Sequence, residues 1–295
     1  MEDATAPKTL SPEFVKLHSG NALKFSEIQS VTRRSYTPII FLAGDVKSGK
    51  TTLLGSIHDA FQFGPLEGYK FAGCETPVAL EERCFESRVR SGARRPDTPR
   101  TRYEAGQEYL HLRLRKDITQ PFQEILFADM SGEFYERAIQ NSAELAEFSI
   151  LKRSDYLVLL LDGGKLLDHE QRQNVRQDGL TFLRRCQESG LLRESTTLQV
   201  MISKWDVVLQ RPQLEQDQCF QFITSRFNET VIHRQVSVIR AASRPSPDSS
   251  GVDKLFGLKS VFVDWMEITH YALRARRLTP QVPESAKIFN QISSQ

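Results

Sequence analysis

Short apolar segments of strand length alternate with longer amphipathic segments along most of this chain. Five of the apolar segments are nearly continuous, at 38–43, 122–128, 156–161, 198–203 and 236–240. Segments with helical periodicity lie between them, at 50–61, 133–152, 169–188, 214–227 and 253–276. Continuous apolar runs are typical of parallel strands covered on both faces, whereas YLHLRL at 109–114 alternates strictly and fits an edge strand. The pattern predicts an α/β fold, a doubly wound, mostly parallel sheet with helices on both faces.

The same alternation indicates how the chain is divided. It predicts three parts, an N-terminal extension at 1–35, one domain at 36–277 and a flexible C-terminal tail at 278–295. Residues of about 64–107 interrupt the alternation and form an insertion, in which 77–91 has a short helical pattern. A further helix is expected around 22–30, within the extension.

Composition argues against several classes of protein. With 39 basic and 37 acidic side chains the formal net charge is +2, so the chain lacks the electrostatic footprint of a dedicated nucleic-acid-binding protein. No apolar segment is long enough to span a membrane, and the N-terminus does not resemble a secretory signal. The four cysteines have neither disulfide nor zinc spacing, which favours reduced thiols in a cytoplasmic protein.

The first predicted strand runs into GDVKSGKT, which matches the phosphate-loop pattern G-x-x-x-x-G-K-[ST]. Its glycines let the backbone fold tightly, so that successive N–H groups point at phosphate oxygens, and the next helix adds its N-terminal dipole. Lys50 supplies a cation for the terminal phosphates, and Thr51 a hydroxyl for Mg²⁺. A glycine-rich turn without a ligand is the alternative, but the position between a strand and a helix favours phosphate binding. The residues predicted to contact the phosphates are Gly44, Asp45, Val46, Lys47, Ser48, Gly49, Lys50, Thr51 and Thr52.

A second candidate motif, DMSG at Asp129–Gly132, follows the strand-like segment 122–128. A carboxylate at Asp129 can hold Mg²⁺ opposite Thr51, and the N–H of Gly132 can meet a γ-phosphate and move when that phosphate leaves. The pattern D-x-x-G is not specific by itself, because it recurs at Asp248–Gly251, where no strand precedes it and a turn is expected. The preceding strand is therefore what supports Asp129 as a metal ligand.

A third candidate motif, SKWD at Ser203–Asp206, ends another predicted strand. A carboxylate at Asp206 would accept hydrogen bonds from two adjacent N–H donors of guanine, a pair that adenine lacks. The stem of Lys204 is expected to lie over the base, with its head tied to the phosphate loop. The alternative is a loop whose Lys and Asp simply face water. After the last strand, the small residue Ala242 would let a backbone N–H approach the guanine oxygen.

In this order along the chain, these four features resemble the motifs of Ras-like P-loop GTPases of the translation-factor-related class. The resemblance covers about 36–277. The insertion and the DMSGE and SKWD variants are most similar to the bacterial family called double-GTPases. The resemblance implies that GTP or GDP and Mg²⁺ bind at the carboxyl ends of the strands, with two loops that sense the γ-phosphate.

The chain departs from the usual family pattern at three places. Ser203 stands where Asn or Thr is usual, and Val46 and Lys47 stand where a glycine pair is often found. Glu133 replaces the Gln that commonly orients the attacking water, and a carboxylate near the γ-phosphate is repelled unless it is paired or protonated. Hydrolysis is therefore expected to be slow, to use Glu133 as a base, or to need a partner. The residues assigned to catalysis are Lys50, Gly132 and Glu133.

The resemblance also implies that a threonine of the first sensing loop binds Mg²⁺. Thr98 is selected, with Thr101 and Thr76 as alternatives, so the predicted metal ligands are Thr51, Asp129 and Thr98. The region is also rich in arginine, at Arg83, Arg88, Arg90, Arg94, Arg95, Arg100 and Arg102. These side chains form a solvated loop, a surface for a protein partner, or a cationic group that acts on the phosphates of the same chain.

The sequence thus favours a Mg²⁺-dependent guanine-nucleotide-binding switch that hydrolyses GTP to GDP and phosphate, slowly or with a partner. An effector or activator protein is expected at the sensing loops or at the arginine-rich insertion. Two alternatives stay open. One is a nucleotide-bound interaction scaffold that does not hydrolyse, and the other is a P-loop ATPase or kinase in which SKWD is accidental.

Overall fold

The strands of the protein form one sheet. The computed structural model describes residues 19–87, 108–231, 234–246, 249 and 251–278. The strands are β1 (Ile39–Gly44), β2 (Lys70–Gly73), β3 (Glu108–Arg115), β4 (Gln123–Asp129), β5 (Tyr156–Asp162), β6 (Thr197–Ser203) and β7 (Val236–Arg240), in the spatial order β2-β3-β4-β1-β5-β6-β7. Neighbours from β4 to β7 pair in parallel, and β3 pairs antiparallel with both β2 and β4. The predicted mostly parallel α/β sheet is confirmed.

The prediction that 109–114 forms an edge strand is wrong. That segment forms β3, but β2 pairs with it on the outer side, with a register shift between Phe71 and Gly73. β2 is only four residues long, and its residues are exposed or half-buried. Because β2 buries no apolar face, its sequence lacks the periodicity that marks the other strands.

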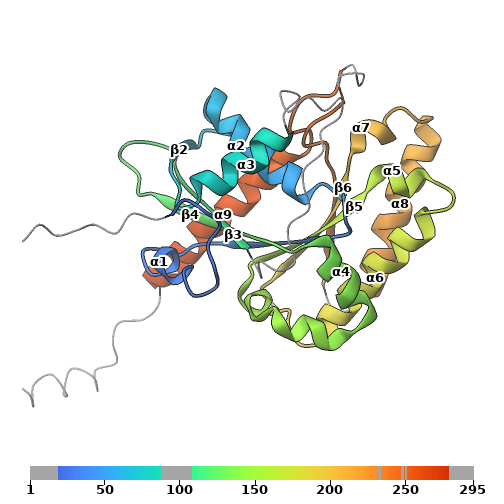
Figure 1. Cartoon of the computed structure of the whole chain (residues 1–295), viewed down its shortest axis with the longest axis horizontal. Coiled ribbons are helices and arrows are strands. Elements are labelled where there is room, and N and C mark those ends of the chain that lie inside the picture. The colour runs from blue at the N-terminus through green and yellow to red at the C-terminus, as the bar shows by residue number, and fades with distance from the viewer. Residues whose placement is uncertain (1–18, 88–107, 232–233, 247–248, 250, 279–295) are drawn as a thin grey trace, which may run out of the picture.

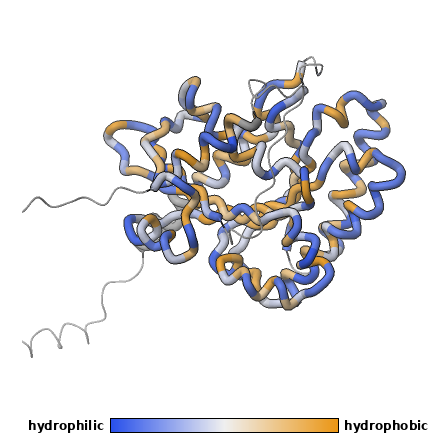
Figure 2. Tube along the Cα trace, in the orientation of Figure 1, coloured by the Kyte–Doolittle hydropathy of each residue, from blue (hydrophilic) through white to orange (hydrophobic). Residues whose placement is uncertain are grey.

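Helices cover both faces of the sheet (Figure 1). They are α1 (Gln29–Thr32), α2 (Lys50–Phe63), α3 (Pro77–Ser87), α4 (Gly132–Gln140), α5 (Gly163–Leu167), α6 (Arg172–Glu188), α7 (Trp205–Val208), α8 (Gln213–Thr230) and α9 (Leu258–Leu278). One apolar core joins the sheet to α2, α3 and α9, and a second joins it to α4, α6 and α8. Figure 2 shows the apolar strands in the middle of the molecule and mixed helix surfaces around them. In the described ranges, no helix has both the length and the apolarity to cross a bilayer.

The segment 133–152 was expected to be one helix, and this expectation is wrong. The helix α4 ends at Gln140, and two 3₁₀ helices follow, Ser142–Glu147 and Ser149–Arg153. Asn141 separates α4 from the first 3₁₀ helix with an extended backbone (φ −133°, ψ 114°), and its side chain accepts a hydrogen bond from the N–H of Ala143. An Asn side chain that caps the next turn competes with continuation of the helix, which explains the break.

The end of the predicted N-terminal extension packs on the sheet. Leu23 exchanges backbone hydrogen bonds with Tyr109 of β3, and Leu23, Ile28 and Val31 are buried. The helix expected around 22–30 is confined to the four residues of α1, preceded by turns. The domain boundaries themselves stay a prediction.

The candidate site residues meet at one edge of the sheet. In the strand registers Leu42 pairs with Asp129, Gly44 with Leu160, and Asp162 with Ser203. The carboxyl ends of β4, β1, β5 and β6 therefore lie side by side. In open α/β sheets this edge is where ligands bind.

Candidate functional site

The phosphate loop adopts a tight turn between β1 and α2. Gly44 has φ 146°, and a Cβ there would lie 2.6 Å from the carbonyl oxygen of Leu160 on the neighbouring strand. Lys47 and Gly49 also have positive φ, 63° and 98°. Such a backbone directs consecutive N–H groups into a concave surface, at the N-terminus of a 14-residue helix. The loop therefore has the shape that binds phosphate.

Lys50 lies inside this loop. Its side chain is almost completely buried, and Nζ donates to the carbonyl oxygens of Gly44 at 2.7 Å and Asp45 at 3.0 Å. Burial lowers the pKa of Lys50, and the nearby charges of Asp129 and Asp45 act in the opposite direction. An anion bound in the loop would favour the charged ammonium in the same way. Thr51 and Thr52 follow it, half-buried, in the first turn of α2.

The segment after β4 lies against the phosphate loop. A Cβ on Gly132 would lie 2.5 Å from the backbone nitrogen and 2.6 Å from the Cα of Val46, so only glycine fits there. Ser131 caps α4, because its hydroxyl accepts the N–H of Phe134 at 3.2 Å. The Asp129 carboxylate is buried at the end of β4, close enough to Lys50 for their charges to interact. The structure thus brings Asp129 and Gly132 to the phosphate loop.

The third motif also touches this loop. The hydroxyl of Ser203 donates to the carbonyl oxygen of Ser48 at 2.6 Å and also lies 3.2 Å from that of Leu161. A Cβ on Gly49 would lie 3.7 Å from the Cβ of Ser203, in van der Waals contact. Serine is shorter than the Asn or Thr that is usual here, but its hydroxyl joins the end of β6 to the phosphate loop.

Lys204 makes a different contact from the one expected. Its backbone is left-handed (φ 51°), and Nζ pairs with Oδ2 of Asp162 at 2.6 Å. The expectation that its head is tied to the phosphate loop is therefore wrong. Asp162, at the end of β5, supplies a charged partner for this ammonium group. Because 42% of the Lys204 side chain is exposed, the stem stays accessible to a planar ligand.

Asp206 is a buried acceptor. Only 5% of the residue is exposed, and Oδ2 accepts hydrogen bonds from the N–H of Ser246 at 3.0 Å and the hydroxyl of Ser249 at 3.3 Å. The carboxylate therefore faces the loop after β7, as expected of a base pocket. Ala242 lies in this loop, but its N–H donates to the carbonyl oxygen of Phe256 at 3.0 Å. The structure does not direct that amide toward a base.

The threonines proposed for the metal fall in different places. Thr76 is fully buried beside β3, where its hydroxyl accepts the N–H of His111 at 3.0 Å. That contact holds it at the sheet, away from the carboxyl ends of the strands. Thr98 and Thr101 lie outside the described residues.

One of the seven insertion arginines is described. Arg83 is 8% exposed, and its guanidinium pairs with Glu108 at 2.5 Å and donates to the carbonyl oxygen of Ala79 at 3.0 Å. Arg83 therefore belongs to an internal ion pair and not to a solvated loop or a partner surface. The other six arginines lie outside the described residues.

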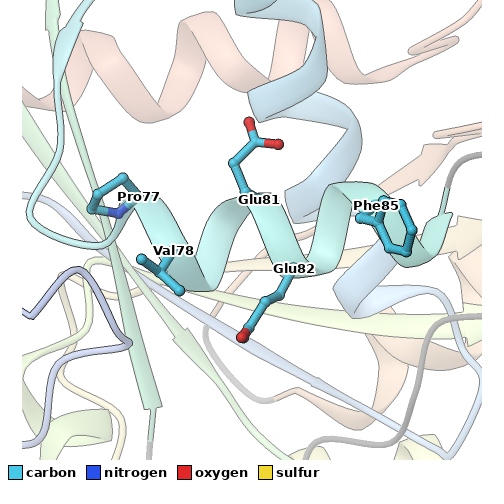
Figure 3. A pocket seen from close by; sticks show the side chains of 5 residues that line it. All are labelled: Pro77, Val78, Glu81, Glu82 and Phe85. Atoms are coloured by element: carbon cyan, nitrogen blue, oxygen red, sulfur yellow. The ribbon is translucent and has the colours of Figure 1, made fainter.

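The described part of the insertion presents an open groove along α3. It has a volume of about 540 Å³ and is lined by Pro77, Val78, Glu81, Glu82 and Phe85 (Figure 3). Val78 and Phe85 leave 43% and 58% of their surface exposed. The groove combines apolar contact area with two carboxylates.

Sequence reasoning missed the turn DGGK at Asp162–Lys165, where β5 runs directly into α5. Asp162 holds Lys204, and Lys165 pairs with Asp45 of the phosphate loop at 2.5 Å. An aspartate at the carboxyl end of a parallel strand, followed by two glycines, is the signal that could have indicated it. Its ion pairs join residues far apart in the chain, so spacing alone could not reveal them.

In the part of the chain that the structure describes, no three His, Cys, Asp or Glu side chains cluster as metal ligands would. A Mg²⁺ ion held mainly by phosphates needs only one or two protein ligands. The pair Thr51 and Asp129 fits such a site, because both lie at the mouth of the phosphate loop, on α2 and β4.

Comparisons with solved structures give distant likenesses. The S. cerevisiae Ski7 GTPase-like domain bound to GDP and inorganic phosphate is 15% identical with a TM-score of 0.44, over 83% of this chain and 52% of that one. The signal recognition particle receptor SRb-GTP/SRX complex of Chaetomium thermophilum is 15% identical with a TM-score of 0.42, over 80% and 99%. A putative nucleolar GTP-binding protein 1 of Plasmodium falciparum is 10% identical with a TM-score of 0.43, over 86% and 95%. The present chain spans about half the length of the Ski7 structure.

No curated protein sequence matches the chain. The sequence profile of the family described as Double-GTPase 2 matches residues 38–266. This match covers well over half of the chain and includes the phosphate loop, Asp129–Gly132, Ser203–Asp206 and Ala242. The chain belongs to the double-GTPase 2 family.

Proposed function

We propose that the protein is a Mg²⁺-dependent guanine-nucleotide-binding switch that hydrolyses GTP to GDP and phosphate. One observation carries the proposal, the hydrogen bond between the Ser203 hydroxyl and the Ser48 carbonyl oxygen. It joins a predicted base motif to a phosphate loop at the same edge of the sheet. A single nucleotide can therefore contact both.

In this proposal the phosphates lie in the loop Gly44–Thr51. Its N–H groups and the N-terminus of α2 supply hydrogen bonds, and Lys50 supplies positive charge. Thr51 and Asp129 would hold Mg²⁺, which neutralises charge that develops on the phosphate oxygens. Gly132 lies against the loop, which supports the proposal that its N–H responds to a γ-phosphate. The threonine that completes the metal site is Thr98 or Thr101.

At the base end of the nucleotide site, Asp206 would accept hydrogen bonds from the two N–H donors of guanine. Its Oδ2 already accepts one backbone N–H and one hydroxyl, so it acts as an acceptor in a nearly buried site. A buried acceptor discriminates strongly against a base that lacks the donor. Since the Ala242 amide is used elsewhere, another N–H of the same loop would contact the guanine oxygen.

Glu133 directly follows Gly132 in the first turn of α4. It is the candidate base for hydrolysis, and a carboxylate there also explains a slow intrinsic rate. The second candidate function, a nucleotide-bound scaffold, is favoured by the groove on α3, whose exposed Val78 and Phe85 suit a protein partner. We place the protein in the cytoplasm, in keeping with four free cysteines.

The proposal is tested by the nucleotide preference of the purified protein and of Asp206→Asn. With Mg²⁺, the wild-type protein is expected to bind GTP and GDP at least about 100-fold more tightly than ATP. Asparagine cannot accept two hydrogen bonds from guanine but pairs with xanthine, so the variant should prefer xanthosine nucleotides. Isothermal titration with GTP, XTP and ATP measures all three affinities. If the variant still prefers GTP, Asp206 does not recognise the base as proposed. If the wild type prefers ATP, the protein is instead an ATPase or kinase.

A further inference from the structure

We propose that Lys165 is a positioning residue for nucleotide binding, because it neutralises Asp45 of the phosphate loop and ties that loop to the turn that holds Lys204. The turn is Asp162–Lys165, which joins the last residue of β5 to the first three residues of α5. This inference rests on the proposed guanine-nucleotide function and names a residue that none of the four motifs contains.

Asp162 fixes the turn in one conformation. Its Oδ1 accepts the N–H groups of Gly164 at 2.9 Å and Lys165 at 3.3 Å, and its Oδ2 accepts Lys204 Nζ at 2.6 Å. The residue is 5% exposed, so these charge-assisted bonds form in a shielded environment, where they are stronger than in water. Lys165 therefore extends from a backbone that is already ordered.

Gly163 brings this turn into direct contact with the base motif. A Cβ on Gly163 would lie 2.5 Å from the carbonyl oxygen of Ser203 and 2.9 Å from Cγ2 of Val208. The backbone of the turn therefore packs on the end of β6 and on the last residue of α7. A displacement of one segment is transmitted to the other.

Lys165 connects the turn to the phosphate loop. Its Nζ lies 2.5 Å from Oδ2 of Asp45, and each of the two side chains is 29% exposed. The other oxygen of Asp45 accepts the N–H of Val46 at 2.6 Å. The position of the carboxylate and the backbone of the phosphate loop are therefore coupled.

The surroundings of Asp45 are acidic. Burial raises the pKa of Glu136 on α4 and of Asp178 on α6, the charge of Asp45 raises both further, and Lys165 lowers both. Without Lys165, negative charge would accumulate beside a loop that must receive the phosphates of a nucleotide. Repulsion of the phosphates would then weaken binding.

The contacts form a closed path between the two ends of the site. Asp45 pairs with Lys165, and at the other end of the turn Asp162 pairs with Lys204. Ser203, next to Lys204 in the chain, donates a hydrogen bond back to Ser48 of the phosphate loop. The phosphate loop is thus held at its second and fifth residues by segments that also position the base motif.

The test measures release of a fluorescent GDP analogue from the full chain in Mg²⁺ buffer. For a half-exposed ion pair we expect Lys165→Ala to release GDP about fivefold faster than the wild type. Lys165→Arg should restore slow release, because arginine keeps the charge. Asp45→Asn removes the need for that charge, so Asp45→Asn/Lys165→Ala should match Asp45→Asn alone. Lys152→Ala, at an exposed lysine in the second 3₁₀ helix, is the control and should behave as the wild type.

A purely structural role for Lys165 would not produce rescue both by Lys165→Arg and by neutralising its partner in Asp45→Asn. Release from Lys165→Ala at the wild-type rate, or release from Asp45→Asn/Lys165→Ala that is faster than release from Asp45→Asn alone, overturns the inference. If Lys165→Ala does not fold, Lys165→Gln, which keeps a polar side chain without the charge, is judged by the same criteria. If the wild type does not bind GDP, the proposed function is overturned, and this inference falls with it. If the wild type binds GDP but the variants do not behave as expected, only this inference is overturned.

Discussion

Gly132 makes the tightest backbone approach between the second motif and the phosphate loop. The nearest atoms to a methyl group at this position would be the nitrogen and Cα of Val46, at 2.5 and 2.6 Å. Neither atom can move without moving the phosphate loop. Because helix propensity favours alanine over glycine, any decrease in the free energy of unfolding of Gly132→Ala must come from this contact.

Gly132→Ala is therefore expected to lower the free energy of unfolding by about 1–3 kcal/mol, as overpacking does, although alanine favours the helix. It should also weaken binding of GTP more than of GDP, because the start of α4 would move away from the γ-phosphate. Urea denaturation and titration with both nucleotides measure the two effects.

Val46→Gly provides a matched control for this contact. The double variant Gly132→Ala/Val46→Gly should remain less stable than Val46→Gly alone, because the clash is with backbone atoms that every residue has. If the double variant were as stable as Val46→Gly alone, the added methyl group would clash only with the valine side chain.

At this scale, sequence reasoning found the residues whose role depends on local spacing. The phosphate loop, Asp129 and Gly132 follow strands, and the structure places them together. The partner of Lys204 and the role of Lys165 could not be found, because their acidic partners lie 42 and 120 residues away. The Ala242 amide was assigned to the base, but Phe256, which the sequence does not mark, accepts its hydrogen bond.

Among the elements, β3 is held to its neighbours by a buried polar group. His111 is fully buried, its Nδ1 accepts the N–H of Glu75 at 2.9 Å, and its Nε2 lies 2.6 Å from Glu124 Oε2. The other oxygen of Glu124 accepts Arg113 Nε at 2.9 Å. Burial alone would raise the pKa of Glu124, but the hydrogen bonds and charges of His111 and Arg113 outweigh it and lower the pKa.

Glu124→Gln should lower the free energy of unfolding at pH 7 by about 1–3 kcal/mol, because the amide cannot accept from both His111 and Arg113. A lowered carboxyl pKa stabilises the folded state above the pKa of the unfolded chain, and this contribution is lost as pH falls through the lowered value. The wild type should therefore lose more stability than the variant between pH 5 and pH 3, as measured by thermal unfolding. Glu194→Gln, at an exposed loop residue, should follow the wild type. Equal acid sensitivity of the wild type and Glu124→Gln would contradict this assignment.

Four of the strands that sequence periodicity predicted well have a continuous buried face. β1, β4, β5 and β6 are buried along nearly their whole length, and all were found within one or two residues. β2 was missed because it buries no face, and the break after α4 was missed because the apolar spacing continues through Asn141. The break is caused by a single capping side chain, which a pattern of hydrophobic residues cannot reveal.

At the scale of the whole molecule, the site is made of segments that only the complete sheet brings together. The phosphate loop follows β1, Asp129 ends β4, the DGGK turn follows β5 and the base motif follows β6. Because these strands are neighbours in the order β4-β1-β5-β6, the four segments form one continuous edge. The proposed hydrolysis would therefore depend on the whole folded domain and would report on every part of the site at once.

The last prediction concerns this property. With Mg²⁺ and enzyme in excess over GTP, phosphate should be released at about 10⁻⁴–10⁻² s⁻¹, the range of intrinsic GTPases without an activator. Lys50→Ala should abolish it, because the loop then lacks its buried cation, and EDTA should abolish it by removing the metal. If Glu133 is the base, Glu133→Gln should release phosphate at the rate of Lys50→Ala, whereas an unchanged rate assigns base catalysis to another group. No excess of wild-type release over Lys50→Ala, in protein that binds GTP normally, would contradict hydrolysis and establish the nucleotide-bound scaffold.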